Sequence, residues 1–183
     1  GGPGTGKTYT ASLLIKHLIN GLSKSEQTSF CIHIAAPTGK AAMQLQKTLQ
    51  KALGFAHTGV KIEATTLHQL LRLSPHSPKK PHPLFADLVV VDESSMIDIP
   101  LMSALLQSLK ANSQLILLGD PYQLPSIEGG APFAEFVQHP LLPRVHLTEC
   151  KRVESAMLLS FAAAVGSGKI DTAMQHLKEE QPE

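Results

Sequence analysis

The hydrophobic positions of the chain follow two patterns that alternate along most of its length. Nearly continuous apolar runs cover residues 30–37, 87–93 and 114–120, and each run is bounded by proline, aspartate or glycine. Such runs are typical of parallel strands that are covered on both faces. A weaker run of the same kind at residues 143–149 predicts a further strand.

Between these runs, apolar residues recur at spacings of three and four, which predicts amphipathic helices. The expected helices cover residues 8–22, 40–53, 100–110, 155–166 and 172–180. Strands that alternate with helices predict an α/β fold with a mostly parallel sheet and helices on both faces. The proline-rich stretch 74–83 cannot form a helix or a central strand, so we expect a surface loop within a single domain there rather than a linker.

The composition is that of an ordinary globular protein and narrows the chemistry only slightly. Of 183 residues, 43% are hydrophobic and 17% are charged, which suits one domain with its own core. The formal net charge of +1 excludes a strongly basic surface, so nucleic-acid binding would need a local patch or loops. No apolar run approaches the ~20 residues that span a bilayer. Cys31 and Cys150 are expected to be free thiols in a reducing cytoplasm.

The chain opens with GGPGTGKT, which matches the phosphate-loop pattern G-x-x-x-x-G-K-[ST] at every fixed position. Glycines allow positive φ angles and let backbone N–H groups approach phosphate oxygens, while the following helix adds its positive N-terminal charge. The Lys7 side chain would bind the β and γ phosphates, and the Thr8 hydroxyl would ligate Mg²⁺. The residues expected to bind the nucleotide are Gly2, Gly4, Thr5, Gly6, Lys7 and Thr8. Such a loop normally follows a strand, so we expect a P-loop sheet that lacks this strand.

A second pattern, VVVDESSM at residues 89–96, places two acidic residues at the carboxyl end of an expected strand. In this position Asp92 would hold Mg²⁺ and Glu93 would orient or activate the attacking water. The alternative is that Asp92 or Ser94 caps a short helix. The phosphate loop upstream favours the catalytic interpretation.

A third pattern, LLGDPYQLP at residues 117–125, ends an expected strand with a turn that presents Gln123. A carboxamide both donates and accepts hydrogen bonds, so Gln123 can contact the terminal phosphate or the water. On spacing alone, a plain turn with Asp120 before proline explains this pattern better.

Together with AAPTGKAA (35–42) and ATTLHQLL (64–71), these patterns come in the order found in superfamily 1 DNA helicases. Within that family the sequence most resembles the RecD group, and residues 147–169 resemble the family's next motif, an arginine followed by a helix. The resemblance implies that residues 1–183 form a single N-terminal RecA-like ATPase domain of a larger helicase.

The resemblance also implies a role for individual residues. Asp92 corresponds to the Mg²⁺ ligand, Glu93 to the catalytic carboxylate and Gln123 to the γ-phosphate sensor. Arg152 corresponds to an arginine directed at the γ-phosphate, its alternative being a surface arginine. The residues in the motifs that contact single-stranded DNA are Pro37, Thr38, Gly39, Lys40, Thr65, Thr66 and His68. The alternative for His68 is a buried place beside its leucine neighbours.

A parent protein of this kind would hydrolyse ATP with Mg²⁺ and translocate 5′ to 3′ on single-stranded DNA. It would act with RecB- and RecC-like subunits as an exodeoxyribonuclease V in double-strand-break repair and recombination. The chain alone is expected to bind nucleotide weakly and to unwind no DNA, because it lacks the second motor domain. Two alternatives stay open: a nucleotide-gated binding module, and a relaxase-helicase with the same motor motifs. The scattered histidines have no zinc-ligand spacing.

Overall fold

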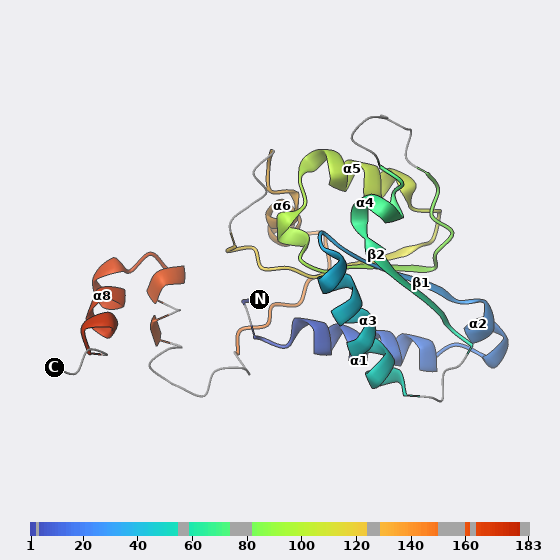
Figure 1. The fold of residues 1–183 in the computed structure, drawn as a ribbon, viewed down its shortest axis with the longest axis horizontal. Coiled ribbons are helices and arrows are strands. Elements are labelled where there is room, and N and C mark those ends of the chain that lie inside the picture. The colour runs from blue at the N-terminus through green and yellow to red at the C-terminus, as the bar shows by residue number, and fades with distance from the viewer. Residues whose placement is uncertain are drawn as a thin grey trace. The chain divides into compact units, whose positions relative to one another are not determined.

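The computed structural model describes residues 1–2, 4–54, 59–73, 82–123, 129–149, 160–161 and 164–179. The chain divides into two compact units, of which the larger is Lys7–Val145. The smaller unit combines Gly1–Gly6 with His146–Glu183. The sheet and its covering helices belong to the larger unit (Figure 1).

The larger unit is built on a four-stranded parallel sheet with the strand order β2-β1-β3-β4. Its strands are β1 (Cys31–Ala36), β2 (Lys61–Thr66), β3 (Leu88–Val91) and β4 (Gln114–Leu117). The predicted parallel α/β fold is therefore confirmed. Because all pairings are parallel, the carboxyl ends of the four strands meet at one edge of the sheet.

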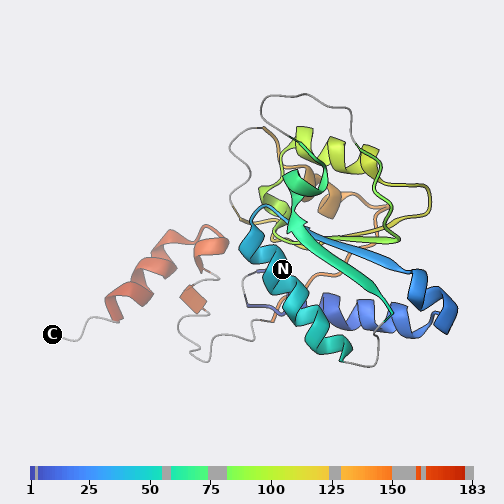
Figure 2. The same ribbon diagram turned by 45° about the vertical axis from the view of Figure 1, so that its right-hand side comes forward.

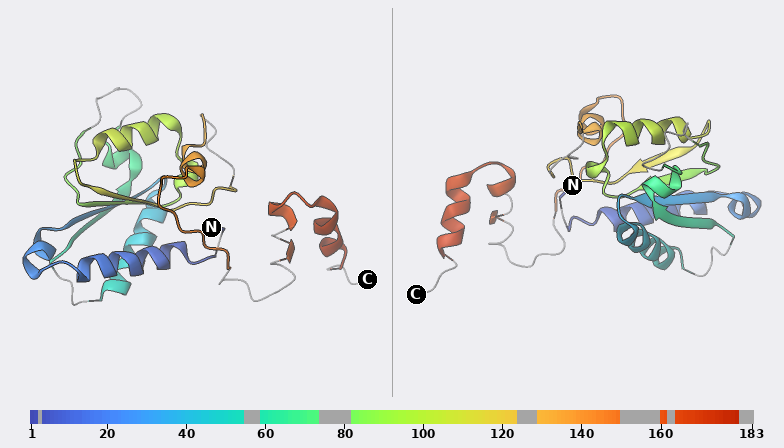
Figure 3. Two further views of the ribbon diagram at one scale, coloured as in Figure 1. Left: turned by 180° about the vertical axis from the view of Figure 1, so that it is seen from behind. Right: turned by 45° about the horizontal axis from the view of Figure 1, so that its top comes forward.

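Helices cover both faces of this sheet (Figures 1 and 2). On one face lie α1 (Lys7–Asn20) and α3 (Gly39–Leu53), which contact each other. On the other face lie α4 (Leu67–Leu70) and α5 (Ile99–Ser108). The same layering is seen in Figure 3, from behind on the left and with the top turned forward on the right. The remaining short helices are α2 (Lys24–Ser29), the 3₁₀ turn η1 (Ser94–Met96) and α6 (Pro132–Gln138).

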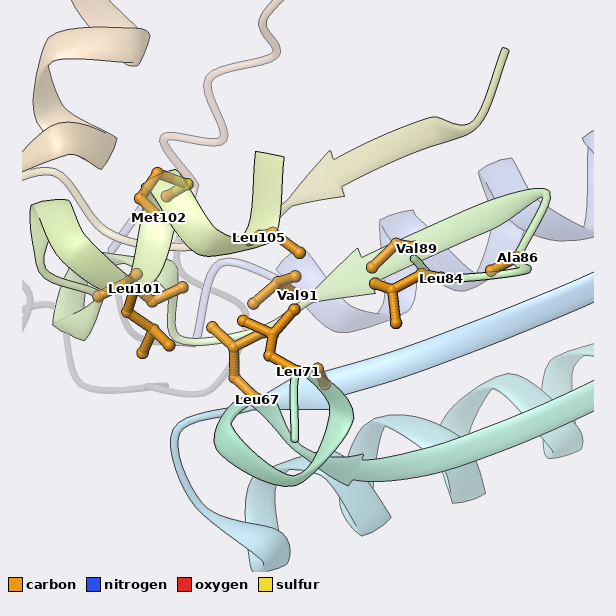
Figure 4. Close-up of a cluster of buried hydrophobic side chains, with 11 residues drawn as sticks. Leu67, Leu71, Leu84, Ala86, Val89, Val91, Leu101, Met102 and Leu105 are labelled. Carbon is orange, nitrogen blue, oxygen red and sulfur yellow. The ribbon is translucent and has the colours of Figure 1, made fainter. Parts of the chain in front are cut away.

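Two clusters of buried apolar side chains hold these layers together. The cluster beneath α1 and α3 consists of Ile15, Ile19, Ile32, Ile34, Leu45, Leu49, Leu53, Leu88 and Val90. The cluster beneath α4 and α5 includes Leu67, Leu71, Leu84, Val89, Val91, Leu101, Met102 and Leu105 (Figure 4). Strand β3 contributes alternate residues to the two clusters, which is why all four of its residues are apolar and buried. Each fully buried Leu or Ile side chain stabilises the fold by about 1.5–3 kcal/mol.

The sequence prediction misses one strand and predicts another that does not form. The apolar pattern misses β2, because this edge strand exposes Lys61 and Glu63, which form an ion pair of 2.8 Å. The predicted strand at 143–149 is wrong: these residues form no strand, and 143–146 are exposed. No described strand pairs with this segment, and Pro143 has no N–H to donate to a ladder.

The long helices agree with the sequence prediction. Helices α1, α3 and α5 each begin one residue before the expected range. The apolar pattern does not predict the short helices α2, α4 and α6. Their starts nevertheless carry local signals, such as the capping box of Ser23 and Glu26 before α2 and Pro132 at the start of α6. Residues 74–81 of the expected loop lie outside the described residues.

The smaller unit contains the phosphate loop and the helix α8 (Ile170–Glu179), which lies near the expected helix 172–180. Most of the expected helix 155–166 lies outside the described residues, although the described positions 160–161 and 164–166 are helical. In this unit Gly1 packs so closely on Leu147 that a Cβ atom would collide with the Leu147 carbonyl oxygen. Across the described residues, no helix has the length and apolar character needed to cross a membrane.

Candidate active site

The parallel sheet brings the motif residues of four separate segments to its carboxyl edge. Residues 37–40 follow β1 and residues 65–68 stand at the end of β2. Asp92 comes directly after β3, and the turn that contains Gln123 comes shortly after β4. Ligands of open α/β sheets bind at this edge, where strand ends supply loops and polar side chains.

The phosphate loop has the backbone conformation that its glycines predict. Gly4 and Gly6 have φ angles of 74° and 84°, in the left-handed region that favours glycine. Thr5 closes a turn inside the loop, because its hydroxyl donates to the Gly2 carbonyl at 2.8 Å. Gly6 leads directly into α1, which begins at Lys7, so the loop ends at a helix N-terminus.

The first turn of α1 and the end of β3 meet at Asp92. The Thr8 side chain donates a hydrogen bond to the Asp92 carboxylate, and the Lys7 ammonium is near enough to act on the same group. Burial is the largest influence and raises the pKa of Asp92 above its ordinary 3.8, against the Glu93 N–H, Lys7 and Thr8, which lower it. Residues far apart in the sequence therefore form one cluster of two hard oxygen donors and one cation.

Glu93 has an unusual backbone conformation at the edge of this cluster. Its φ and ψ angles are 52° and 37°, a left-handed conformation that costs a residue with a side chain about 1–3 kcal/mol. Its N–H donates to the Asp92 carboxylate at 2.9 Å, and its side chain is exposed. No side chain caps η1, and the Ser94 hydroxyl donates to the Val91 carbonyl at 3.0 Å, so the capping alternative for Asp92 and Ser94 is wrong.

Gln123 is held in a turn next to the segment that follows β3. The turn forms as the sequence predicts, because the buried Asp120 accepts the N–H of Tyr122 at 3.2 Å through its carboxylate. The buried Ser95 hydroxyl donates to the Gln123 carbonyl oxygen at 3.4 Å. The sequence does not predict this role of Ser95, because no local pattern around a serine indicates a partner in another segment.

The residues predicted to contact DNA lie where β1 passes into α3 and where β2 passes into α4. Thr38 caps α3 by accepting the Ala41 N–H, and Thr66 caps α4 in the same way. A Cβ atom at Gly39 would lie 3.8 Å from the Thr66 methyl group, so the start of α3 lies next to the end of β2. His68 is exposed, and its alternative as a buried histidine is therefore wrong.

The remaining predicted residues concern Arg152, the cysteines and the candidate metal ligands. Arg152 lies outside the described residues, as do Cys150, His57 and His76, while Cys31 is a free thiol. Within the described ranges no three His, Cys, Asp or Glu side chains come together to hold a metal ion. The Thr8 and Asp92 oxygens remain suited to Mg²⁺, which takes few protein ligands when it also binds phosphate.

The fold and the residues at its carboxyl edge define a RecA-like α/β domain of the P-loop class. The sequence matches the family described as AAA domain over residues 1–181, and the chain belongs to that family.

The relatives of the chain agree with the resemblance drawn from its motifs. The chain is 39% identical over 160 residues to the RecBCD enzyme subunit RecD of Haemophilus influenzae, covering 80% of this chain and 24% of that protein. It is 38% identical to the Mycolicibacterium smegmatis RecBCD enzyme subunit RecD, covering 75% and 27%. It is 32% identical to the ATP-dependent RecD2 DNA helicase of Deinococcus radiodurans, covering 83% and 19%. The chain thus spans about a quarter or less of the length of these relatives.

Solved structures with the same fold include the Pif1 helicase from Bacteroides, in complex with ADP-AlF3 and single-stranded DNA. That chain superimposes with a TM-score of 0.58 at 20% identity, covering 92% of this chain and 42% of its own. A second structure, Bacteroides Pif1 bound to single-stranded DNA, gives a TM-score of 0.56 at 18% identity and covers 92% and 42%. At this identity the similarity establishes the fold.

Proposed function

We propose that residues 1–183 form the nucleotide-binding motor domain of a RecD-type DNA helicase. The single observation that carries the proposal is the meeting of Thr8, Lys7 and Asp92, which would set a phosphate-binding helix start beside a metal-binding carboxylate. The relatives named RecD and RecD2 support the same activity. We infer that the parent protein hydrolyses ATP and translocates 5′ to 3′ on single-stranded DNA.

The loop of Gly1–Gly6 and the start of α1 would bind the triphosphate. With positive φ angles at Gly4 and Gly6, the loop would turn backbone N–H groups toward the phosphates, and the Lys7 side chain would add a positive charge at the β and γ phosphates. Thr8 and Asp92 offer the hard oxygen ligands that suit Mg²⁺. The bound ion would neutralise charge on the phosphate oxygens.

Hydrolysis would depend on the exposed side chains next to this cluster. Glu93 would orient the attacking water and accept its proton; its position directly after Asp92 and a side chain free of capping bonds support this role. Gln123 would contact the terminal phosphate or the water from the loop after β4. Lys7, together with Arg152, would stabilise the negative charge that develops on the transferred phosphoryl group.

Single-stranded DNA would bind across the junction of β1 with α3 and the junction of β2 with α4. Pro37, Thr38 and Gly39 would contact the strand together with Thr65, Thr66 and His68, through hydroxyl, N–H and imidazole groups. The exposed Lys40 would add a phosphate contact that weakens as salt rises. Since the chain carries little net charge, these local contacts would supply the affinity.

The names of the relatives support an inference about the partners and location of the parent protein. The name RecBCD enzyme subunit RecD supports an assembly with RecB- and RecC-like subunits, which would act in the cytoplasm as an exodeoxyribonuclease V in double-strand-break repair and recombination. The domain alone would bind nucleotide weakly and unwind no DNA, since in a helicase of this kind the cleft needs a second motor domain.

The decisive experiment replaces the proposed catalytic carboxylate in the full-length parent protein. Glu93→Gln should lower DNA-stimulated ATP hydrolysis by about 10²–10⁴-fold while ATP binding persists, because the amide keeps the shape of the side chain but cannot accept the proton. Glu135→Gln, an exposed glutamate on α6, is the matched control and should leave the rate unchanged. Unaltered hydrolysis in Glu93→Gln would overturn the proposal, and unaltered function of the whole complex would favour a nucleotide-gated binding module.

A further inference from the structure

The buried side chain of Ser95 connects the segments that follow β3 and β4. We propose that Ser95 is a positioning residue, which fixes the Gln123 carboxamide with its carbonyl oxygen turned toward Ser95 and its NH₂ group turned toward the terminal phosphate. This inference rests on the proposed function and specifies which end of Gln123 that function uses. The contact behind it is the Ser95 hydroxyl donating to the Gln123 Oε1 atom at 3.4 Å.

Ser95 is anchored more firmly than its partner. Its side chain is buried, whereas the Gln123 side chain is exposed. The preceding residue, Ser94, donates its N–H to the Leu118 carbonyl at 2.8 Å and its hydroxyl to the Val91 carbonyl at 3.0 Å. These bonds attach the Ser95 segment to the ends of both strands, so Ser95 can hold Gln123 in place rather than follow it.

The backbone around this contact is packed closely. A Cβ atom at Gly119 would lie 3.1 Å from the Ser95 nitrogen. Gly119 therefore allows the two loops to approach each other closely. This approach brings the Ser95 hydroxyl to Gln123, which lies four residues after Gly119. The contact is a product of this approach and depends on both loops.

The chemistry of the amide makes its orientation matter. Phosphate oxygens accept hydrogen bonds only, so they need the NH₂ group of a glutamine, and a carbonyl oxygen facing them would be repelled. A terminal amide rotates with little preference between its two orientations unless a hydrogen bond fixes one. By occupying the carbonyl oxygen, Ser95 leaves the NH₂ group to the phosphate and ensures that Gln123 acts as a donor.

The test is a double-mutant cycle of Ser95→Ala and Gln123→Ala in the full-length parent protein, read as kcat and KM for ATP with DNA present. The net value of one hydrogen bond of about 0.5–1.5 kcal/mol corresponds to a loss of about twofold to tenfold in kcat for Ser95→Ala, with KM for ATP unchanged. In the Gln123→Ala background the same substitution should have no further effect, because the group that Ser95 positions is absent. Ser95→Thr keeps the hydroxyl and should restore most of the rate.

The control is Ser108→Ala, which removes another buried hydroxyl that bonds to the carbonyl of Ala104 at 2.8 Å on α5. It should leave kcat unchanged. If Ser95→Ala lowers kcat equally with and without the Gln123 side chain, the positioning role is refuted. It is also refuted if Ser95→Thr has the low kcat of Ser95→Ala while its melting midpoint matches that of the wild type. If Gln123→Ala itself leaves hydrolysis unchanged, the proposed role of Gln123 fails, and that outcome is distinct from the failure of Ser95 alone.

Discussion

Replacing Gly119 by alanine tests the packing that joins the loops after β3 and β4. Gly119 has no positive φ angle, so its backbone conformation is open to alanine. The obstacle is space: the added methyl group would lie 2.7 Å and 2.8 Å from two ring carbons of Phe133 and 3.1 Å from the Ser95 nitrogen. All three distances are shorter than a normal carbon contact, and the Ser95 atom belongs to the backbone.

The expected cost follows from how little each neighbour can move. The Phe133 ring is buried on α6, and Ser95 belongs to a segment bonded to two strands. Overpacking of this kind destabilises a fold by about 1–3 kcal/mol. For a chain of this size, each kcal/mol lowers the melting midpoint by about 2–4 °C, so Gly119→Ala should lower it by about 2–12 °C.

Thermal melting by circular dichroism, supported by urea denaturation, measures this loss. Gly39→Ala is the matched control, because a Cβ atom there would have its nearest neighbour at an ordinary 3.8 Å, and it should melt with the wild type. Phe133→Leu combined with Gly119→Ala should lose less stability than the sum of the single variants, since the smaller side chain relieves the collision. A Gly119→Ala variant that melts with the control would refute the close packing described for this loop.

Three further predictions concern charge. Asp92→Asn should abolish ATP hydrolysis yet raise the unfolding midpoint at pH 7. Burial raises the pKa of Asp92, so the folded state disfavours the charged form that the substitution removes. The gain in midpoint should therefore shrink as pH falls toward 3.8. Burial also lowers the pKa of His33 below 6.5, although the Glu63 carboxylate 3.6 Å away raises it. The contribution of neutral His33 to the free energy of unfolding is therefore complete above pH 6.5 and is lost as pH drops through the lowered pKa. In urea melts at several pH values, His33→Gln should make this loss smaller. Lys40→Ala should reduce the salt slope of single-stranded DNA binding, measured by fluorescence anisotropy, by about 0.7, and Lys47→Ala, further along α3, should leave it unchanged.

The sequence predicts the parts of this fold whose burial leaves a local pattern. Strands β1, β3 and β4 are continuous apolar runs because they are covered by helices, and the pattern finds them. Strand β2 escapes the same reasoning, since an edge strand can expose Lys61 and Glu63 and still pair along its whole length. The false strand at 143–149 shows the converse, because a run with apolar residues forms a strand only where a partner strand is available.

The candidate site likewise contains contacts that the sequence predicts and contacts that it does not. The pairing of Thr8 with Asp92 is predictable from two local patterns. The phosphate-loop motif indicates where a helix starts, and the acidic pair follows a buried strand. The contact of Ser95 with Gln123 is not, because it depends on how far the turn after Gly119 brings a second loop toward the first. Arg152 stays a prediction, since it lies outside the described residues.

Two of the residues proposed to act on ATP depart from what stability alone would favour. Asp92 is a carboxylate whose burial works against its charge, and Glu93 holds a left-handed conformation that asparagine or glycine would adopt more easily. Selection for stability would remove both features, and a sequence can keep them when function requires them. Glu93→Gly should therefore raise the unfolding midpoint of the chain or leave it unchanged, although glycine elsewhere is costly, while hydrolysis by the parent protein is lost. A clear drop in the midpoint of Glu93→Gly, measured beside Glu135→Gly as the control in helix α6, would show that the Glu93 side chain stabilises the fold and that its conformation carries no strain.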